Sequence, residues 1–508
     1  MSLSVNNNIT ALNAWGNLKK TDFMMSKSME KLSSGLRINR AADDPAGLVI
    51  SEKMRAQLAG LDAAVKNSEK AINMIATAES ALDQVQKLLD KMRQLALDSA
   101  NSGVNDAASL QANQDELDEA IASITRIADY TQFGTKKLLN GTLGTNFTAD
   151  TSDTLGAKIS AASFKGITDT DKAGTVTLQI TDQAEQASVT LTLGGKAISA
   201  TNEVLIRSVA FTLNGVTISA ASGTAMDDLA RTINGYSDTT GVTATWSSTN
   251  DVLVLKSDDY GSEKYVTLSN TVGTYSTGTA LYSVAAATDY GVDYQATATY
   301  ADGNTTTFDQ GKGLTLIDSL GNTIVLSTGT IASGTTTYDV GTLSVNQAKF
   351  QVGANENQTV TVSVQSVKAA NLGIGATYTD ANGTSQNVST FASLDKLKSG
   401  GAYTNGVFVD GGADAIAQAI GVIDEALDEI STVRGELGAV ESSTLQVQLN
   451  NLRVSYENLQ AAESTIRDTD MTSEMANFTK YQIMMQAGTA MLAQANQSPN
   501  IILQLLAS

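Results

Sequence analysis

Cysteine and histidine are absent from the 508 residues, and proline and tryptophan occur only twice each. Without thiol and imidazole side chains the chain cannot form disulfides, ligate zinc or haem through cysteine or histidine, or build a Ser-His-Asp or Cys-His catalytic group. These classes of chemistry are excluded, and we expect no active site, no cofactor and no metal site.

Positive charge is also scarce. The chain has 53 acidic side chains against 33 basic ones, a formal net charge of −20. Such a balance repels phosphate backbones and anionic headgroups, and the two lysine pairs, Lys19-Lys20 and Lys136-Lys137, form no extended basic patch. We expect no nucleic-acid partner and no membrane partner.

Targeting and membrane segments are missing as well. The first four residues lack the basic region of a secretory signal, and asparagines at 6–8 break the apolar run that follows. No stretch reaches the roughly 18 apolar residues that a membrane-spanning helix needs. This pattern indicates either a cytoplasmic chain or export without a cleaved signal peptide.

Charge and glycine divide the chain into three segments. Residues 1–140 carry 16 basic and 17 acidic side chains, 141–412 carry 13 and 24, and 413–508 carry 4 and 12. The middle segment holds 31 of the 41 glycines, and its Thr-, Ser- and Val-rich runs alternate over short stretches, which is typical of strands and turns. Ends nearly free of glycine and proline predict long helices. The fold class is therefore α+β.

The helical ends have a sustained apolar spacing of three or four residues. Over 44–100 this spacing predicts one helix of about 57 residues, roughly 85 Å long. A second run over 110–128 follows a turn near 101–103, which predicts an antiparallel helical hairpin. A third run over 416–466 has the same stripe, so the two chain ends come together and the middle projects as an insertion.

The outermost residues, 5–36 and 471–506, are apolar on more than one helix face. One interpretation is an ordinary two-helix core pair. The other is a pair of segments that order only on self-association, because a monomer cannot bury so much apolar surface. The residues predicted to carry such assembly are Val5, Ile9, Leu12, Leu32, Leu36, Met475, Phe478, Met485, Leu492 and Leu505.

Several motifs resemble those of bacterial flagellins. Near the start they are NNITALN at 7–13, LSSGLRIN at 32–39 and ADDPAG at 42–47; near the end they are RGELGAV at 434–440, IRDTD at 466–470, QAG at 486–488 and LAQANQ at 492–497. Together they cover roughly 1–142 and 413–508. In the middle, FTLNGVTI at 211–218 and LVLKS at 253–257 resemble the small insertion motif of flagellins and hook-associated proteins, and FQVGAN at 350–355 resembles a hairpin segment of the family.

The resemblance implies five segments. Two are inner-tube helices, at 1–43 and 468–508. Two form a helical stalk domain: 44–175, which includes the start of a β-hairpin, and 347–467, which includes the rest of that hairpin. The fifth is a β-rich outer insertion at 176–346, with the insertion motif at about 209–270. The implied function is the structural subunit of the flagellar filament, exported unfolded and assembled outside the cell. Implied partners are other copies of the chain, hook-associated junction and cap proteins, the export apparatus and an export chaperone.

Two further groups of residues receive roles from the resemblance. Arg37, Asp43 and Asp44 lie in the spoke that joins the inner and outer tubes, where Asp43-Asp44-Pro45 also marks a helix start and Arg37 or Arg40 is a candidate ion-pair partner for either aspartate. The family's contact for Toll-like receptor 5 and for neighbouring protofilaments matches Asp90, Lys91, Arg93, Leu95 and Glu116.

In that receptor segment Asp90 replaces an amide and Lys91 an arginine, which weakens a bidentate interface. Two alternatives to a flagellin remain open: a hook–filament junction protein, and a secreted coiled-coil adhesin whose β-rich middle binds a surface ligand.

Overall fold

The structure is a computed structural model that describes residues 8–101, 103–152, 155–167, 169–192, 204–205, 208–248, 252–270, 287–327, 331, 333–334, 336–379, 385–388 and 390–507. The chain divides into two compact units, which are described separately. The first contains 1–72, 350–360 and 442–508, and the second contains 73–349 and 361–441. The predicted α+β class, with helical ends and a β-rich middle, is confirmed.

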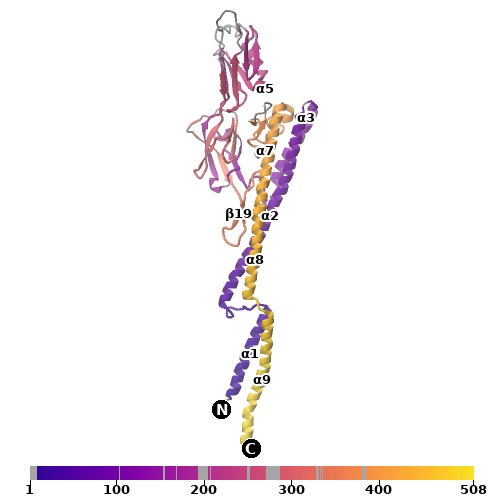
Figure 1. Ribbon diagram of the computed structural model, residues 1–508, viewed down its shortest axis with the longest axis vertical. Coiled ribbons are helices and arrows are strands. Elements are labelled where there is room, and N and C mark those ends of the chain that lie inside the picture. Colours follow the sequence, from indigo (N-terminus) through magenta and orange to yellow (C-terminus); the bar gives the residue numbers. More distant parts are fainter. Residues whose placement is uncertain are drawn as a thin grey trace. The chain divides into compact units, whose positions relative to one another are not determined.

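The first unit contains an antiparallel pair of terminal helices, α1 (Ile9–Ser34) and α9 (Met471–Ala507), which lie side by side (Figure 1). At one end of the pair the Asn8 amide donates to the Ala495 carbonyl at 2.9 Å. The Asn8 side-chain oxygen also accepts from the Ala11 amide and caps α1. At the other end Gly35 closes α1 in the left-handed conformation, with φ 72°.

The first unit also contains the start of α2 (Pro45–Ser99), α8 (Gln446–Arg467) and residues 350–360. The two helices are joined by ion pairs of 2.7 Å, Arg467 with Glu52 and Arg453 with Glu69. The Gly47 amide donates to Asp44 at 2.9 Å, so the Asp-Pro segment starts α2 as its sequence predicts.

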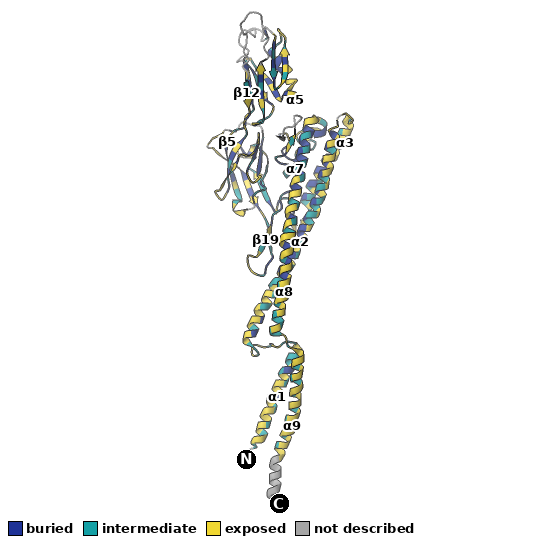
Figure 2. Cartoon of the chain, in the orientation of Figure 1, coloured by how far each residue is buried: buried dark blue, intermediate teal, exposed yellow. Residues whose placement is uncertain are grey.

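Helix α2 matches the helix predicted over 44–100, but its stripe is buried unevenly. From Met74 onward the stripe is closed from solvent, with Leu82, Val85, Leu89 and Met92 all at 0 % exposure. Before Met74 the larger stripe residues are only half-buried, and the fully buried positions are small. The first part of α2 therefore retains apolar surface that its own chain does not cover (Figure 2).

The second unit adds α3 (Ala107–Tyr130), α6 (Val407–Asp410) and α7 (Gly412–Ala439) to the remainder of α2. Asp106 caps α3 by accepting from the Ser109 amide at 2.8 Å. The buried Gln114 amide group joins α3 to α6, because it accepts from the Phe408 amide at 3.0 Å and donates to the Leu397 carbonyl at 3.1 Å. The predicted antiparallel hairpin is thereby fixed to the C-terminal helices.

One irregular turn interrupts the third apolar run. Between α7 and α8 lies a π-helical segment, η5 (Val440–Leu445). The apolar spacing over this run is three or four residues except from Val440 to Leu445, where the step is five. A π turn accommodates the extra residue and returns Leu445 to the buried face.

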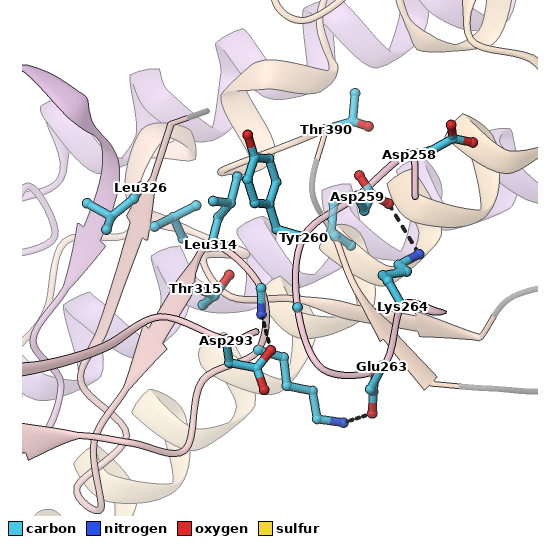
Figure 3. Close-up of a pocket in the computed structure, with 15 residues that line it drawn as sticks. Asp258, Asp259, Tyr260, Glu263, Lys264, Asp293, Leu314, Thr315, Leu326 and Thr390 are labelled. Atoms are coloured by element: carbon cyan, nitrogen blue, oxygen red, sulfur yellow. Dashed lines mark hydrogen bonds and ion pairs between the residues drawn. The ribbon is translucent and has the colours of Figure 1, made fainter. Parts of the chain in front are cut away.

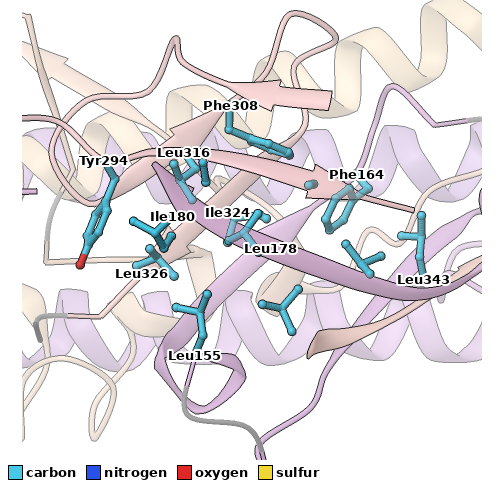
Figure 4. Close-up of a cluster of buried hydrophobic side chains, with 14 of the residues drawn as sticks. Leu155, Phe164, Leu178, Ile180, Tyr294, Phe308, Leu316, Ile324, Leu326 and Leu343 are labelled. Atoms are coloured by element: carbon cyan, nitrogen blue, oxygen red, sulfur yellow. The ribbon is translucent and has the colours of Figure 1, made fainter. Parts of the chain in front are cut away.

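The β-rich part of the second unit contains two antiparallel sheets that share one core (Figure 4). The strand order of the five-stranded sheet is β14 (Thr305–Phe308), β13 (Gln295–Thr299), β5 (Gly174–Asp182), β17 (Thr337–Val345) and β3 (Thr145–Ala149). The strand order of the three-stranded sheet is β15 (Thr315–Ile317), β16 (Thr323–Leu326) and β4 (Ile159–Ser163). Strand β3 comes from residues assigned above to the stalk. The sheet therefore begins about 30 residues before the expected boundary at 176.

A second β-rich core is inserted between β5 and β13. Its three-stranded sheet has the order β6 (Ser188–Thr192), β10 (Val252–Ser257), β9 (Val242–Ser247). Its four-stranded sheet has the order β12 (Ala287–Tyr290), β11 (Tyr265–Asn270), β7 (Val209–Leu213), β8 (Val216–Ala220). Helix α4 (Met226–Asn234) packs against β9, and the short α5 (Ser237–Thr240) follows. Phe211, Leu229 and Leu253 lie in one closed apolar cluster of this insertion.

Small elements complete the fold: hairpins β1 (Gln132–Phe133) with β2 (Lys136–Lys137), β18 (Ala348–Gln351) with β19 (Thr359–Val362) and β20 (Thr377–Thr379) with β21 (Ser385–Asn387), and 3₁₀ turns η1 (Gly156–Lys158), η2 (Thr170–Lys172), η3 (Ala369–Asn371) and η4 (Leu394–Leu397). Within the described ranges, no helix has both the length and the apolar composition to cross a membrane.

Replacing Leu89 by alanine tests the buried stripe of α2. Because Leu89 is fully enclosed, Leu89→Ala is expected to lower the free energy of unfolding by about 2–5 kcal/mol. Leu97→Ala, on the same helix but 48 % exposed, is the matched control and should change it by less than about 0.5 kcal/mol. Urea unfolding followed by circular dichroism measures both; equal effects would contradict the burial pattern.

Candidate assembly surfaces

The pair formed by α1 and α9 has no apolar core. Helix α1 buries only Thr21 and Ser28, and no side chain described in α9, up to residue 497, is buried (Figure 2). Large apolar side chains instead face solvent, with Phe23 69 % and Ile483 60 % exposed. Such a pair gains little of the roughly 1.5–3 kcal/mol available from burying each large apolar side chain.

The residues predicted for self-assembly lie mostly on this open pair. Ile9, Leu12 and Met475 are more than half exposed, and Leu32, Leu36, Phe478, Met485 and Leu492 are half-buried. Val5 lies outside the described residues, and Leu505 lies in the last turns of α9, where only the backbone is described. Their role in assembly stays a prediction.

A few polar contacts align the two terminal helices. The Ser28 hydroxyl donates to the Glu474 carboxylate at 2.5 Å. Near the other end, Leu18 lies so close to Gly488 that a Cβ atom there would meet the leucine side chain at 3.1 Å. These contacts fix the register of the pair, but they supply little of the burial that would stabilise it alone.

The spoke over 35–44 is attached to the α8–α9 junction by backbone bonds. The Arg37 amide donates to the Arg467 carbonyl at 2.7 Å, and the Thr469 amide donates to the Gly35 carbonyl at 2.9 Å. The Arg37 guanidinium donates to the Ile466 carbonyl, with a distance of 3.1 Å from Nε. Arg37 therefore binds backbone and not a carboxylate.

The predicted ion pairing within the spoke is wrong. Asp43 is paired with Lys27 of α1 at 2.8 Å, and Arg40 with Glu30 at 3.0 Å. Asp43 also accepts from the backbone amides of Asn39 and Arg40, and the hydrogen bond from Lys27 is the main cause that lowers its pKa from 3.8 to about 2. The left-handed turn at Gly35 folds the spoke back along α1, so the basic and acidic side chains of α1 are the ones within reach.

The predicted receptor segment lies on α2 and α3 of the second unit. Lys91 forms an ion pair with Glu116, and Arg93 forms one with Asp424 of α7, where Nε lies 2.6 Å from Oδ1. The Arg93–Asp424 contact raises the pKa of the guanidinium. Asp90 is exposed and Leu95 is half-buried. Asp90, Lys91, Arg93 and Glu116 are thus all exposed, and the two ion pairs join α2 to α3 and to α7.

One buried charge was not predicted from the sequence. Glu429, on the apolar side of α7, lies 2.5 Å from Lys165 and accepts from the Gly373 amide at 3.0 Å. Burial raises its pKa, and Lys165 opposes that shift. The only signal for it in the sequence is an acidic residue beside Ile430 in the apolar stripe of α7.

A cavity of about 260 Å³ lies at the base of the insertion (Figure 3). Four of its charged side chains form ion pairs, Lys264 with Asp259 at 3.2 Å and Lys312 with Glu263. Asp293 accepts hydrogen bonds from the backbone amides of Ser262 and Gly313. Across the described residues no group of three or more Asp or Glu side chains is placed to hold a metal ion. The carboxylates here tie loops together and form no acid–base pair.

Glycines let three backbone segments meet at this base. A Cβ atom on Gly291 would lie 2.4 Å from the Gly261 carbonyl oxygen, and one on Gly261 would lie 2.7 Å from the Gly313 nitrogen. Glu185 and Val292 exchange backbone hydrogen bonds of 3.0 and 2.9 Å beside them. The chain enters and leaves the insertion through this neck, which is defined mainly by backbone.

Three sequence families match parts of the chain. The bacterial flagellin N-terminal helical region matches residues 5–143, the bacterial flagellin C-terminal helical region 420–506, and the flagellin hook IN motif 175–259.

Individual relatives agree with these matches. The flagellin of Clostridium tyrobutyricum is 32 % identical over 496 residues, which cover 97 % of this chain and 99 % of that protein. The flagellin of Halalkalibacterium halodurans is 51 % identical over 141 residues, 28 % of this chain and 52 % of the relative, so that match spans about half of the relative's length. The solved structure of FliC from Burkholderia pseudomallei has 15 % sequence identity and a TM-score of 0.23, and the match covers 74 % of this chain and 99 % of that chain.

The Lys27–Asp43 pair predicts an acid-sensitive spoke. Because folding lowers the pKa of Asp43 to about 2, its carboxylate stabilises the fold fully above about pH 4 and loses that contribution as the pH falls toward 2. Asp43→Asn should therefore cost about 1 kcal/mol at pH 6, a small value because Lys27 is partly solvated, and almost nothing at pH 2. Urea unfolding at both pH values, with Asp22→Asn on the exposed side of α1 as control, measures the difference; a pH-independent cost would contradict the pairing.

Proposed function

The chain belongs to the bacterial flagellin family, and we propose that it is the structural subunit that polymerises into the flagellar filament used for swimming. The observation that carries the proposal is the terminal helix pair, whose large apolar side chains face solvent in the single chain. Burial of those side chains between copies supplies the free energy of polymerisation.

In this proposal α1 and α9 of many copies pack into an inner tube around a lumen. The half-buried stripe in the first part of α2 contacts neighbouring copies in the next layer. The protein acts by packing and carries no active site: interlocked helices make a stiff tube, and small shifts between alternative packings give the curvature that converts rotation into thrust.

The proposed location is the flagellar filament outside the cell. A chain without cysteine forms no disulfide that would obstruct transport in an unfolded state. The proposed partners are the export apparatus, an export chaperone that covers the terminal helices before assembly, and the junction and cap proteins at the two ends of the filament.

A second proposed partner is Toll-like receptor 5, through the charged surface of Asp90, Lys91, Arg93 and Glu116. In the single chain Lys91 and Arg93 are already engaged with Glu116 and Asp424. A receptor that contacts these side chains must exchange those ion pairs for its own, which limits its affinity.

Seeded polymerisation tests the main proposal. Purified full-length chain added to filament fragments should extend them into long polymers. Deleting 471–508 should abolish extension while leaving the helices of 44–130 and 413–466 folded by circular dichroism, because those helices have their own buried contacts. Short capped oligomers would favour a junction protein, no polymer would favour an adhesin, and normal filaments from the truncated chain would contradict the mechanism.

A single substitution makes the same test sharper. Ile483 is 60 % exposed in the single chain, so Ile483→Asp should leave the stability of the monomer unchanged and slow seeded extension at least about tenfold, since a buried unpaired charge is costly. Gln482→Asp adds the same charge at the adjacent exposed position and is the matched control. Equal rates for wild type and Ile483→Asp would show that this face of α9 stays in solvent.

Receptor binding is tested with the monomer and the purified receptor ectodomain. Restoring the family's residue types with Asp90→Gln and Lys91→Arg should raise the affinity about tenfold, because a guanidinium forms bidentate contacts that an ammonium cannot. Arg126→Lys, elsewhere on the exposed part of α3, is the control. No detectable binding by either the wild type or the double variant would overturn this partner.

A further inference from the structure

The four-stranded sheet of the insertion has an outward face that no other described segment of the chain covers. Its inward residues, such as Phe211, Val266 and Leu268, are buried in the core of the insertion. The outward residues alternate with them along the strands, and Tyr265, Ser269, Thr217, Ser219, Thr288 and Tyr290 are exposed.

The strand register places these side chains in rows across the sheet. Tyr265 lies opposite Tyr290, and Thr267 lies opposite Thr288, whose hydroxyls are 3.2 Å apart. Ser269 lies opposite Thr212, which in turn lies opposite Thr217. Four strands at about 4.8 Å spacing make a face about 14 Å wide, enough for two or three sugar rings.

The outward positions that the structure describes on β7, β8, β11 and β12 are occupied by serine, threonine, tyrosine and one alanine. None of these side chains is charged. Exposed sheet faces usually carry charged side chains that keep other molecules away. The other sheet of the insertion carries one charge, Lys256 on β10, among the serine, threonine and valine residues at the outward positions of β6, β9 and β10. In a chain with net charge −20, a continuous uncharged face indicates a neutral partner.

The two tyrosines give the face its apolar contact surface. Their rings lie 6.1 Å apart at an angle of 49°, and the residues are 47 % and 61 % exposed. A tyrosine ring loses few rotatable bonds on binding, and its hydroxyl donates or accepts a hydrogen bond. Rings flanked by hydroxyls match a sugar, which presents C–H groups to aromatic faces and hydroxyls to polar side chains.

We propose that this face of the insertion binds a neutral glycan, with Tyr265 and Tyr290 stacking on sugar rings and the threonines and serines bonding to sugar hydroxyls. An acidic polysaccharide would find no counter-charge on the face. A second copy of the face would bring hydroxyls against hydroxyls with little apolar burial, so a copy of this chain suits it less well.

Affinity electrophoresis of the full-length monomer tests the proposal, because the net charge of −20 gives the chain a strong mobility toward the anode. Native gels contain dextran, mannan or amylose as neutral probes, alginate as the acidic probe, or no polymer. At least one neutral polymer should retard the chain, and alginate should not. Tyr265→Ala with Tyr290→Ala should weaken retardation about tenfold, as expected when central aromatic anchors are lost.

Two variants serve as controls. Tyr236→Ala removes a tyrosine that is 45 % exposed elsewhere on the insertion and should bind like wild type. Tyr265→Phe with Tyr290→Phe keeps both rings and should retain most of the retardation, which separates stacking from misfolding.

Three outcomes would overturn the proposal: no retardation by any neutral polymer, retardation by alginate, or retardation that the double alanine variant leaves unchanged. Concentration-dependent self-association that the alanines abolish, without glycan binding, would overturn it as well and assign the face to a second copy.

Discussion

The main physical constraint on this chain is that its terminal helices pair without enclosing an apolar core in the part that the structure describes. Two polar residues of α1 are buried against α9, and every large apolar side chain described on α9 retains solvent contact. Hydrogen bonds such as Ser28 to Glu474 align the pair but contribute little net stability. Packing between copies in the proposed filament would supply the apolar burial that this pair lacks in the single chain.

The two parts of α2 differ in how completely their apolar stripe is buried. Beyond Met74 the stripe is closed by α3 and α7 of its own chain, to which the Lys91–Glu116 and Arg93–Asp424 pairs join α2. Before Met74 the same apolar spacing continues, yet its larger side chains stay half-buried. A single periodic sequence thus forms a closed core in one part of a helix and leaves apolar surface open in another.

Sequence reasoning succeeded where structure is determined locally. The Asp44-Pro45 start of α2 was predicted from the sequence, whereas the five-residue step from Val440 to Leu445 was not recognised as a break until the structure showed a π turn there. It failed where partners lie far apart along the chain. The pairing of Asp43 with Lys27 depends on how the spoke folds back at Gly35, and the pairing of β3 with β17 joins strands nearly 200 residues apart, whose short alternating patterns fit many partners. Family membership was readable from the terminal motifs, whereas the assembly and receptor residues remain predictions.

The neck that attaches the insertion uses mainly backbone atoms and few of the side chains on the surface of the inserted sheets. Three backbone segments meet at Gly261, Gly291 and Gly313, and Asp293 binds amide groups, so few of the side chains of the inserted sheets take part in the joint. Residues on the outward faces can therefore be exchanged without changing how the domain is attached to its support.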